Sequence, residues 1–394
     1  RLYARAGQAA IVYGSGITQY TGGADSVRAL ANLALLTGNI WRNGGGIFAL
    51  QKDSNAQGAC DMGALPDFLP GYQSVKDVEA RKKFEAHWHV ELPSDPGLTA
   101  LEMIKQIKSG KIKGLYIVGE NPVLSFPRPD LVKEALSSLH FLAVQDLFLT
   151  ETAEQANVVF PAASFAEKEG TFTNFEGKIG RLRKAIAPVG ESLPDGEIIL
   201  RLANKMEQPL PFSDIRQVME EIEELVPLYS DYLDLDEKYQ DELGSWEKRS
   251  YRRPSLKGFP RFSNVGYSSP AREADGDYPF TLITEAVLPH FGTGTRSSRA
   301  WRLKEFSPQI ILSISIADAQ KLGVSDFDQV KIISPVSSLT AVASITDSLP
   351  EGTVSLPISF PEAPATGLFA IDLDAETKTP ALKACKVRIE KIKG

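Results

Sequence analysis

The chain has 394 residues, a length at which two or three domains are expected instead of one. Its net charge of −7 and the lack of a long basic run argue against nucleic-acid binding. No stretch approaches the roughly 18 consecutive apolar residues of a membrane span, and the first residues, RLYARAGQAAIVYG, lack the pattern of a signal peptide.

Cysteine and histidine are scarce in this sequence. Cys60 and Cys385 lie far apart, so this chain alone is expected to hold no iron–sulfur cluster, because such clusters normally take four thiolates. His87 and His89 have no carboxylate or thiol at a ligand-like spacing, so an exposed helix end is favoured there over a zinc site. The low cysteine content is typical of a reducing cytoplasm.

Strand and helix patterns alternate through the first two hundred residues. The AAIVY run at residues 9–13 predicts a buried strand, and Asp25 is expected to cap a following helix that stops at Gly38. Further segments follow in order: a helix over 98–110, a strand over 114–119, a helix over 129–139, a strand over 140–149, a helix over 153–156 and a strand over 157–161. This alternation predicts a parallel sheet with helices on its faces, and so an α/β fold.

The pattern changes after Met206. An amphipathic helix is expected over 213–226, and the acidic and basic blocks beyond it predict a helical, charged linker over residues 207–277. From Tyr278 onward six short β segments dominate, at 280–284, 309–315, 329–335, 339–346, 353–358 and 385–392, with one helical turn at 316–323. These segments predict a mostly β, barrel-like domain closed on itself.

Polar and glycine residues follow three of the predicted strands. In chain order they are Gly14, Gly16, Thr18 and Gln19, then Gly119, Glu120 and Asn121, then Gln145, Asp146 and Thr150. Ligands bind at the carboxyl ends of the strands in open α/β sheets, and glycine lets the backbone approach a phosphate. These loops therefore predict a nucleotide or pterin site, with ordinary surface turns as the alternative.

The segment QKDSNAQGACDMG, residues 51–63, carries a lone cysteine. Its neighbour Asp61 is expected to raise the pKa of the Cys60 thiol, which favours a packed residue over a reactive one. Gly58 and Gly63 indicate instead that the backbone passes close to a non-protein group. Ser15, Ser54 and Ser164 lack a nearby histidine that could act as a base, so no nucleophile is expected.

Several segments together resemble the molybdopterin oxidoreductases, especially formate dehydrogenase large subunits and the large iron–sulfur subunit of respiratory complex I. They occur in the family's order: GSGITQYTGGADSVRALANLALLTGNI, NAQGACDMGALPDFLPGY, GENP, VQDLFLTETAEQANVVFPAASFAEKEGTFTNFEG, HFGTGTRSSR and TKTP. The resemblance implies two related doubly wound α/β domains and a C-terminal β-barrel domain around a molybdenum or tungsten bis-pterin guanine dinucleotide. It implies that residues 1–53 end one α/β domain, that 54–206 are the second half of the other, and that 278–394 form the dinucleotide-binding barrel.

The same resemblance assigns site residues. Gly14, Gly16, Thr18 and Gln19 would line one pterin dinucleotide, and Gly119, Glu120, Asn121, Gln145, Asp146 and Thr150 would hold the other nucleotide end. The pterin core would lie near Gln57, Gly58, Asp61 and Gly63, and His290, Thr293, Gly294, Thr295, Lys378 and Lys383 would close over it from the barrel. The implied partners are an N-terminal iron–sulfur part of the same subunit, which would also carry the metal ligand, and other electron-transfer subunits.

Three positions depart from the formate dehydrogenase pattern. Gln51 stands where an arginine orients formate, with Lys52 beside it; Ala286 replaces an arginine four residues before His290, and Thr366 replaces an asparagine. A neutral amide cannot form the bidentate, charge-assisted pair that arginine makes with a carboxylate. The cofactor is therefore expected to be held weakly or to be lost.

The leading hypothesis is the C-terminal part of a complex I large subunit with a degenerate cofactor cleft, in the cytoplasm or on the inner face of a membrane through its complex. The alternatives are the catalytic part of a molybdenum or tungsten enzyme such as formate dehydrogenase, in which Lys52 or another residue replaces the arginine, and a nucleotide-binding module without catalysis. A metal ligand or ferredoxin-like cysteines upstream would separate the first two.

Overall fold

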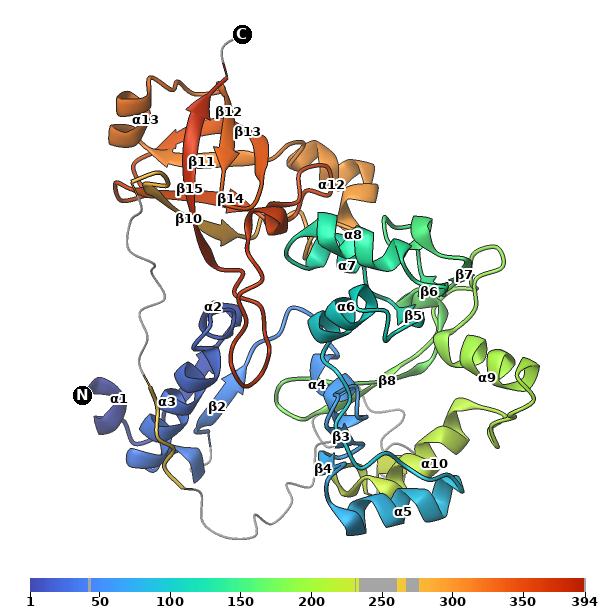
Figure 1. Cartoon of the computed structure of the whole chain (residues 1–394). Helices are drawn as coiled ribbons and strands as arrows, with labels where there is room; N and C mark the ends of the chain where they lie inside the picture. Colours follow the sequence, from blue (N-terminus) through green and yellow to red (C-terminus); the bar gives the residue numbers. More distant parts are fainter. Residues whose placement is uncertain (42–43, 231, 234–260, 267–275, 393–394) are drawn as a thin grey trace.

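The computed structural model describes residues 1–41, 44–230, 232–233, 261–266 and 276–392. The C-terminal β-barrel lies above two α/β parts, one built by the first fifty residues and one that contains strands β5–β7 (Figure 1). In these described ranges no helix combines the length and apolar character that a membrane crossing needs.

The first α/β part is small. It contains α1 (Leu2–Arg5), β1 (Ala10–Tyr13), α2 (Ser15–Thr18), α3 (Gly23–Leu36), η1 (Asn39–Trp41) and β2 (Gly46–Ala49), and β1 pairs with β2 in parallel. The prediction that Asp25 caps the helix is wrong, because α3 begins at Gly23 and Asp25 lies in its first turn. The chain turns so tightly before α3 that a Cβ on Gly23 would lie 2.3 Å from the Thr18 carbonyl oxygen. Gly38 ends the helix with a φ of +68°, as expected.

The second α/β part is built on a parallel sheet with the strand order β5-β6-β7. Its elements are α6 (Ala100–Lys108), β5 (Gly114–Val118), α7 (Pro122–Ser125), α8 (Pro129–Ser137), β6 (Phe141–Asp146), η2 (Ala153–Gln155) and β7 (Val158–Pro161). Strand β6 ends at Asp146, three residues before the predicted end. Apolar faces of α6 and α8 pack on β6 through residues such as Ile107, Leu136 and Val144. The predicted α/β alternation is confirmed, and it places the ends of β5 and β6 side by side.

A third apolar cluster joins segments far apart in the sequence. The elements β3 (Phe68–Leu69), α5 (Val78–Trp88), β9 (Ile179–Leu182), α10 (Ile215–Leu225) and η4 (Pro227–Tyr229) contribute buried residues to it. The other elements outside the parallel sheet in this part of the chain are α4 (Ala56–Asp61), β4 (Gln73–Ser74), η3 (Phe165–Glu167), β8 (Gly170–Thr173) and α9 (Asp195–Lys205). Phe84 of α5 packs with Met219 and Leu225 of α10 in this core. The described part of the predicted linker, up to residue 233, thus contributes to a core, because the apolar face of α10 finds a partner on α5.

The C-terminal end of α5 contacts carboxylates that were not predicted from the sequence. His87 lies 3.3 Å from Glu221 and 3.5 Å from Glu224, both on α10. These partners are more than a hundred residues away in the chain, so no spacing rule could find them. Among the described residues no group of three histidine, cysteine or acidic side chains is arranged to hold a metal ion.

The C-terminal domain is a closed barrel with the strand order β10-β14-β11-β13-β12-β15. Its strands are β10 (Phe280–Glu285), β11 (Ile311–Ser315), β12 (Gln329–Ile333), β13 (Ser338–Thr346), β14 (Thr353–Pro357) and β15 (Ala384–Lys391). Between them lie η6 (Ser297–Arg299), α12 (Trp301–Phe306), α13 (Ile316–Leu322) and η7 (Ala365–Leu368). All six predicted β segments and the helical turn are confirmed, because alternate residues of each strand point into one apolar interior.

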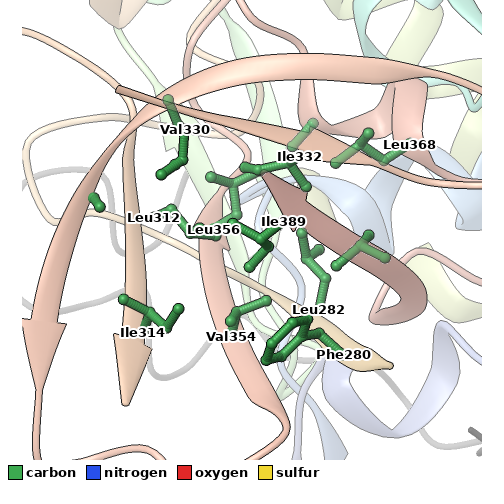
Figure 2. Close-up of a cluster of buried hydrophobic side chains, with 14 of the residues drawn as sticks. Phe280, Leu282, Leu312, Ile314, Val330, Ile332, Val354, Leu356, Leu368 and Ile389 are labelled. Atoms are coloured by element: carbon green, nitrogen blue, oxygen red, sulfur yellow. The ribbon is translucent and has the colours of Figure 1, made fainter. Parts of the chain in front are cut away.

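The barrel interior is filled with aliphatic side chains (Figure 2). Leu282, Leu312, Ile332 and Leu356 come from four different strands and are fully buried. A barrel this well filled is a rigid support for the loops at its rim.

We expect Leu312→Ala to destabilise the barrel by about 2–5 kcal/mol, since it leaves a cavity in the interior. Because a chain with several cores does not unfold in one step, the measurement is hydrogen exchange of the barrel strands. Ile311→Ala is the matched control, because Ile311 directly precedes Leu312 in β11 and is 39% exposed. Equal loss of protection in both variants would contradict this description of the core.

Candidate functional site

A cavity of about 230 Å³ lies where the ends of β5 and β6 face a loop of the barrel. Its wall includes the predicted site residues Gln19, Gly119, Glu120, Asn121, Asp146, Thr293 and Thr295. The remaining lining residues are Lys52, Asp53, Ser125, Thr284, Phe291, Gly292, Arg296, Ile358, Thr366, Phe369 and Leu382. Residues from both α/β parts and from the barrel therefore meet in one place.

The turn after β5 is shaped by its backbone. Gly119 has a φ of +67°, and a Cβ at this position would meet open space, so the left-handed conformation is what requires glycine. The Asn121 amide donates to Glu151 at 2.8 Å and to Thr295 at 3.2 Å, while its carbonyl oxygen accepts from Thr152 at 2.6 Å. Since both polar atoms of Asn121 already have protein partners, this side chain fixes the turn and joins it to the barrel.

Asp146, at the end of β6, is a carboxylate that is only 3% exposed. Its Oδ1 accepts a hydrogen bond from the Leu147 amide at 2.7 Å and lies 3.8 Å from Nη2 of Arg296. A buried carboxylate is costly unless it is paired and hydrogen-bonded. Because a carboxylate can accept about four hydrogen bonds, Asp146 keeps acceptor capacity for N–H groups of a ligand in the cavity.

The barrel loop at residues 290–299 is held rigidly over the strand ends. The buried His290 ring contacts the Ser297 hydroxyl at 3.2 Å and the Ser307 carbonyl at 3.1 Å. Gly294 has a φ of +82°, and a Cβ there would lie 2.1 Å from the Ser359 carbonyl oxygen. His290 and Gly294 do not line the cavity. They shape the loop that carries Thr293, Thr295 and two arginines.

Those two arginines dock the loop onto the α/β part. Arg296 donates to the Gly119 carbonyl at 3.2 Å, and Arg299 donates to the Leu149 carbonyl at 2.9 Å. The Arg299 guanidinium also lies 5.1 Å from the centre of the Phe148 ring. Neither residue was expected at the site from the sequence, although both lie within the HFGTGTRSSR segment, because their carbonyl partners come 177 and 150 residues earlier.

Two predicted site residues turn away from the cavity. Gln145 is fully buried and bonds to Tyr116 and, at 2.6 Å, to Asp195 at the start of α9. Neighbouring strand residues point to opposite faces, so Asp146 reaches the cavity and Gln145 does not. The buried Thr150 hydroxyl accepts from the Ala153 amide at 3.2 Å and so begins a short helix.

Of the four predicted site residues that follow β1, only Gln19 contributes to the cavity. Gly14 precedes α2, while Gly16 and Thr18 lie within it, and Gln19 alone of these four lines the wall. A Cβ on Gly16 would meet nothing within 4 Å, so packing among the described residues does not require this glycine.

The QGACDMG segment forms α4 and sits on a buried polar network. The Asp61 carboxylate is 0% exposed and accepts from Gln57 at 2.9 Å and from the Tyr229 hydroxyl at 3.0 Å. Burial raises the pKa of Tyr229 well above its usual range, and the charge of Asp61 raises this pKa further. A Cβ on Gly58 would lie 3.3 Å from the Thr173 amide nitrogen, so the helix packs tightly on β8.

Gly63 completes this segment with a φ of +78° in a turn that packs against Pro70. Gln57, Gly58, Asp61 and Gly63 do not line the cavity; they anchor the segment that follows Lys52 and Asp53. Burial, followed by the Asp61 charge, raises the pKa of the Cys60 thiol, in agreement with an unreactive, partly buried residue.

A long connection between η7 and β15 reaches from the barrel to the first α/β part (Figure 1). In it Asp374, 3% exposed, accepts from the Ala24 amide at 3.1 Å, which is a free donor in the first turn of α3. Burial raises the pKa of Asp374, but hydrogen bonds led by those from the Thr377 and Ala24 amides outweigh it, so the pKa lies below its usual range. Lys378 bonds within this connection, to the Ala375 carbonyl at 2.6 Å.

Two lysines add positive charge near the cavity. Lys52 lines the wall, and Lys383 follows the lining residue Leu382. Burial lowers the pKa of Lys52, partly offset by Asp53, and it also lowers the pKa of Lys383, with a further contribution from the charge of Lys52. Lys52 is exposed to solvent and yet crowded by protein atoms, as expected for a side chain in the wall of a concave site.

We expect Asp374→Ala to weaken the docking of the barrel on α3 by about 1–3 kcal/mol, because it leaves partly buried amides without their acceptor. The measurement is hydrogen exchange of the first turn of α3. The carboxylate's pKa is lower when folded, so its contribution is full above the unfolded pKa and is lost as pH falls through the folded pKa. Glu376→Ala, which removes an exposed partner of Arg28, is the control and should have little effect.

We expect Tyr229→Phe to destabilise the third cluster by about 1–3 kcal/mol, since the buried Asp61 loses a donor. Thermal or urea unfolding followed by hydrogen exchange of α4 and α10 measures the effect. Tyr3→Phe is the control, because the Tyr3 hydroxyl is buried without a hydrogen-bond partner among the described residues. A loss for Tyr3→Phe as large as that for Tyr229→Phe would contradict the assignment.

Comparison with solved structures finds acetylene hydratase from Pelobacter acetylenicus, with a TM-score of 0.67 over 99% of this chain and 62% of that one. The sequence identity is 14%, so this likeness concerns the fold. The two α/β parts and the barrel are thus an arrangement that a solved protein shares.

Curated relatives point to one group of enzymes. The chain is 42% identical to the F420-dependent formate dehydrogenase subunit alpha of Methanocaldococcus jannaschii and 31% identical to formate dehydrogenase H of Escherichia coli. It is 36% identical to a putative formate dehydrogenase, YrhE, of Bacillus subtilis. Each match covers 98% or more of this chain but only 59%, 57% and 40% of those relatives. These matches favour the formate dehydrogenase alternative over the complex I subunit of our leading hypothesis.

Two family models match in sequence order. "Molydopterin dinucleotide binding domain" covers residues 280–386, which span the barrel strands β10 to β14, the connection to β15 and the first residues of β15. "Molybdopterin oxidoreductase" covers residues 3–205, slightly more than half of the chain. This chain belongs to the molybdopterin oxidoreductase family.

Proposed function

We propose that the protein containing this chain is a molybdenum or tungsten bis-pterin oxidoreductase of the formate dehydrogenase type. In this proposal the chain holds nucleotide ends of the cofactor and presents positive charge to a small carboxylate substrate. The observation that carries it is the cavity at the ends of β5 and β6, where buried Asp146 faces Arg296 and where Lys52, from another part of the chain, lines the same wall. The formate dehydrogenase names of the curated relatives support the same choice.

The lining residues suit a pterin guanine dinucleotide in their chemistry. Asp146 and Glu120 are acceptors for the N–H groups of a base, while Arg296 is a donor for anionic oxygens. Gly119 leaves open space beside the backbone. At about 230 Å³ the cavity is below the usual range of about 300–1,000 Å³ for small-molecule sites, so in this arrangement it would take only part of a dinucleotide.

When bound, the cofactor supplies the metal centre that accepts electrons from the substrate. The chain's own residues bind and orient. Asp146 accepts hydrogen bonds from the base, Asn121 and Thr295 keep the β5 turn joined to the barrel, and Arg296 balances the Asp146 charge. The barrel loop at 290–299 is joined to the strand ends through Arg296 and Arg299, which bond to the Gly119 and Leu149 carbonyls.

The three departures from the formate dehydrogenase pattern have different meanings in the fold. Gln51 is exposed and does not line the cavity, whereas the neighbouring Lys52 does. Thr366 is buried and donates to the Leu124 carbonyl at 2.8 Å, so it joins the barrel to α7. Ala286 is exposed. These three positions therefore remove fewer cofactor contacts in the fold than their residue types had indicated. This weakens the argument for a complex I scaffold.

Electron transfer from the cofactor to an acceptor requires groups that this chain does not supply. The two cysteines are too few for a four-thiolate cluster, so we place the iron–sulfur relay in another part of the same subunit or in partner subunits. The metal ligand belongs to that other part as well.

The test is to purify the native protein containing this chain and to measure molybdenum, tungsten, released pterin fluorescence and formate-dependent dye reduction. We expect metal, pterin and formate oxidation together. Absence of metal and pterin would overturn the proposal in favour of a scaffold role. Pterin and metal without formate oxidation would support the cofactor assignment but would exclude formate as the substrate.

We expect Asp146→Ala to reduce the retained pterin at least about tenfold, since a hydrogen bond to a charged acceptor contributes about 1.5–3 kcal/mol. Pterin per chain after gel filtration measures this. Asp130→Ala is the control, because Asp130 forms an exposed pair with Arg128 and does not line the cavity. Full pterin retention in Asp146→Ala would contradict the role of Asp146.

A further inference from the structure

Lys52 lines the cavity, and Lys383 comes close to it from a different part of the chain, next to a lining residue. Lys52 lies in the segment between β2 and α4, and it lines the wall. Lys383 lies directly before β15, between the lining residue Leu382 and the barrel. Its carbonyl accepts from the amide of Thr284, another lining residue, at 3.1 Å. The two ammonium groups are near enough that the charge of Lys52 affects Lys383.

Neither lysine is neutralised by an ion pair. Within the described ranges no carboxylate lies within 4.0 Å of either ammonium nitrogen, unlike the other cavity cation, Arg296, which faces Asp146. Burial disfavours both charged forms, and the two charges repel each other. Among the described residues, the acidic group that favours the charged form of Lys52 is its neighbour Asp53. Two like charges close together repel each other, and an anion between them offsets that repulsion.

The ends of the Lys52 segment are fixed. The Leu50 amide donates to the Tyr13 carbonyl at 2.7 Å on one side. Asn55 accepts from the Thr173 amide at 2.9 Å on the other side. Lys52 is thus held at the cavity from both ends, which lowers the entropy cost of using its side chain to bind.

We propose that Lys52 and Lys383 together bind the carboxylate of the substrate. This inference rests on the proposed function and goes beyond it by naming the binding groups. Two lysines and Asp53 carry one net positive charge, which matches a monovalent carboxylate better than a phosphate with two charges. Lys52 thereby supplies, one position along the chain, the positive charge that Gln51 lacks.

The test combines three measurements on the native protein: KM and kcat for formate, pterin and metal content, and formate binding by calorimetry. The variants are Lys52→Gln, Lys383→Gln and Lys52→Arg. We expect KM to rise about tenfold or more in each Gln variant, since charge-assisted bonds are the strong ones. We also expect kcat to change less, unchanged pterin content, and partial recovery in Lys52→Arg. Lys331→Gln, on the outside of β12, is the control.

Proton uptake gives a readout independent of turnover. The folded pKa of each lysine is lowered, so a bound carboxylate, which favours the charged form, takes up protons between the lowered pKa and the ordinary lysine value. Calorimetry in buffers of different ionisation enthalpy should show this uptake, and each Gln variant should reduce it. Glu120, Asp146 and Arg296 also line the cavity and stay unchanged in every variant.

The outcomes separate this inference from the proposed function. Unchanged KM and unchanged formate binding in both Gln variants would overturn it while leaving formate oxidation in place. Loss of pterin with a normal KM would also overturn it, because the lysines would then bind a cofactor phosphate. A wild-type protein that contains pterin but binds no formate would overturn this inference and exclude formate as the substrate, while the cofactor assignment would stand.

Discussion

Docking of the barrel on the strand ends is the constraint on which the site depends. Backbone groups at the ends of β5 and β6 and in the first turn of α3 have no partner within their own elements. Arg296, Arg299 and Asp374 from the barrel satisfy the Gly119 and Leu149 carbonyls and the Ala24 amide. The barrel is thereby held to both α/β parts by polar groups that would otherwise need water.

The cavity follows from that docking. The loop at 290–299 is stiffened by His290 and Gly294, and it stops just above the β5 turn because Thr295 meets Asn121. The space left between them is lined by charged groups from three parts of the chain. Charges brought together in this way interact more strongly than on an open surface, since less water screens them.

Polar residues in the predicted motifs divide into two kinds. Asp146 and Lys52 reach the cavity, whereas Gln145, Asp61 and His290 are buried in networks that hold the surrounding elements. Residues of the second kind contribute to the site indirectly, because each anchors a segment that carries a cavity residue. The resemblance to molybdopterin oxidoreductases did not separate these two kinds, since both lie in the same motifs.

The sequence by itself determined the local elements. Alternating apolar residues specified the barrel strands, a capping box at Thr99 and Glu102 began α6, and Gly38 ended α3. The ordered motifs also indicated the family. These features depend on neighbours within a few residues, so they can be read from one chain.

Only the tertiary structure decided which polar residues share the cavity. The face of β6 that meets it, the arrival of Arg296 from a loop about 150 residues later, and the approach of Lys383 to Lys52 all depend on contacts distant in sequence. Even α10, in a segment expected to be a linker, found its partner on α5. Such pairings are set by how apolar faces and unsatisfied backbone groups meet after the elements have formed, and no local pattern records that.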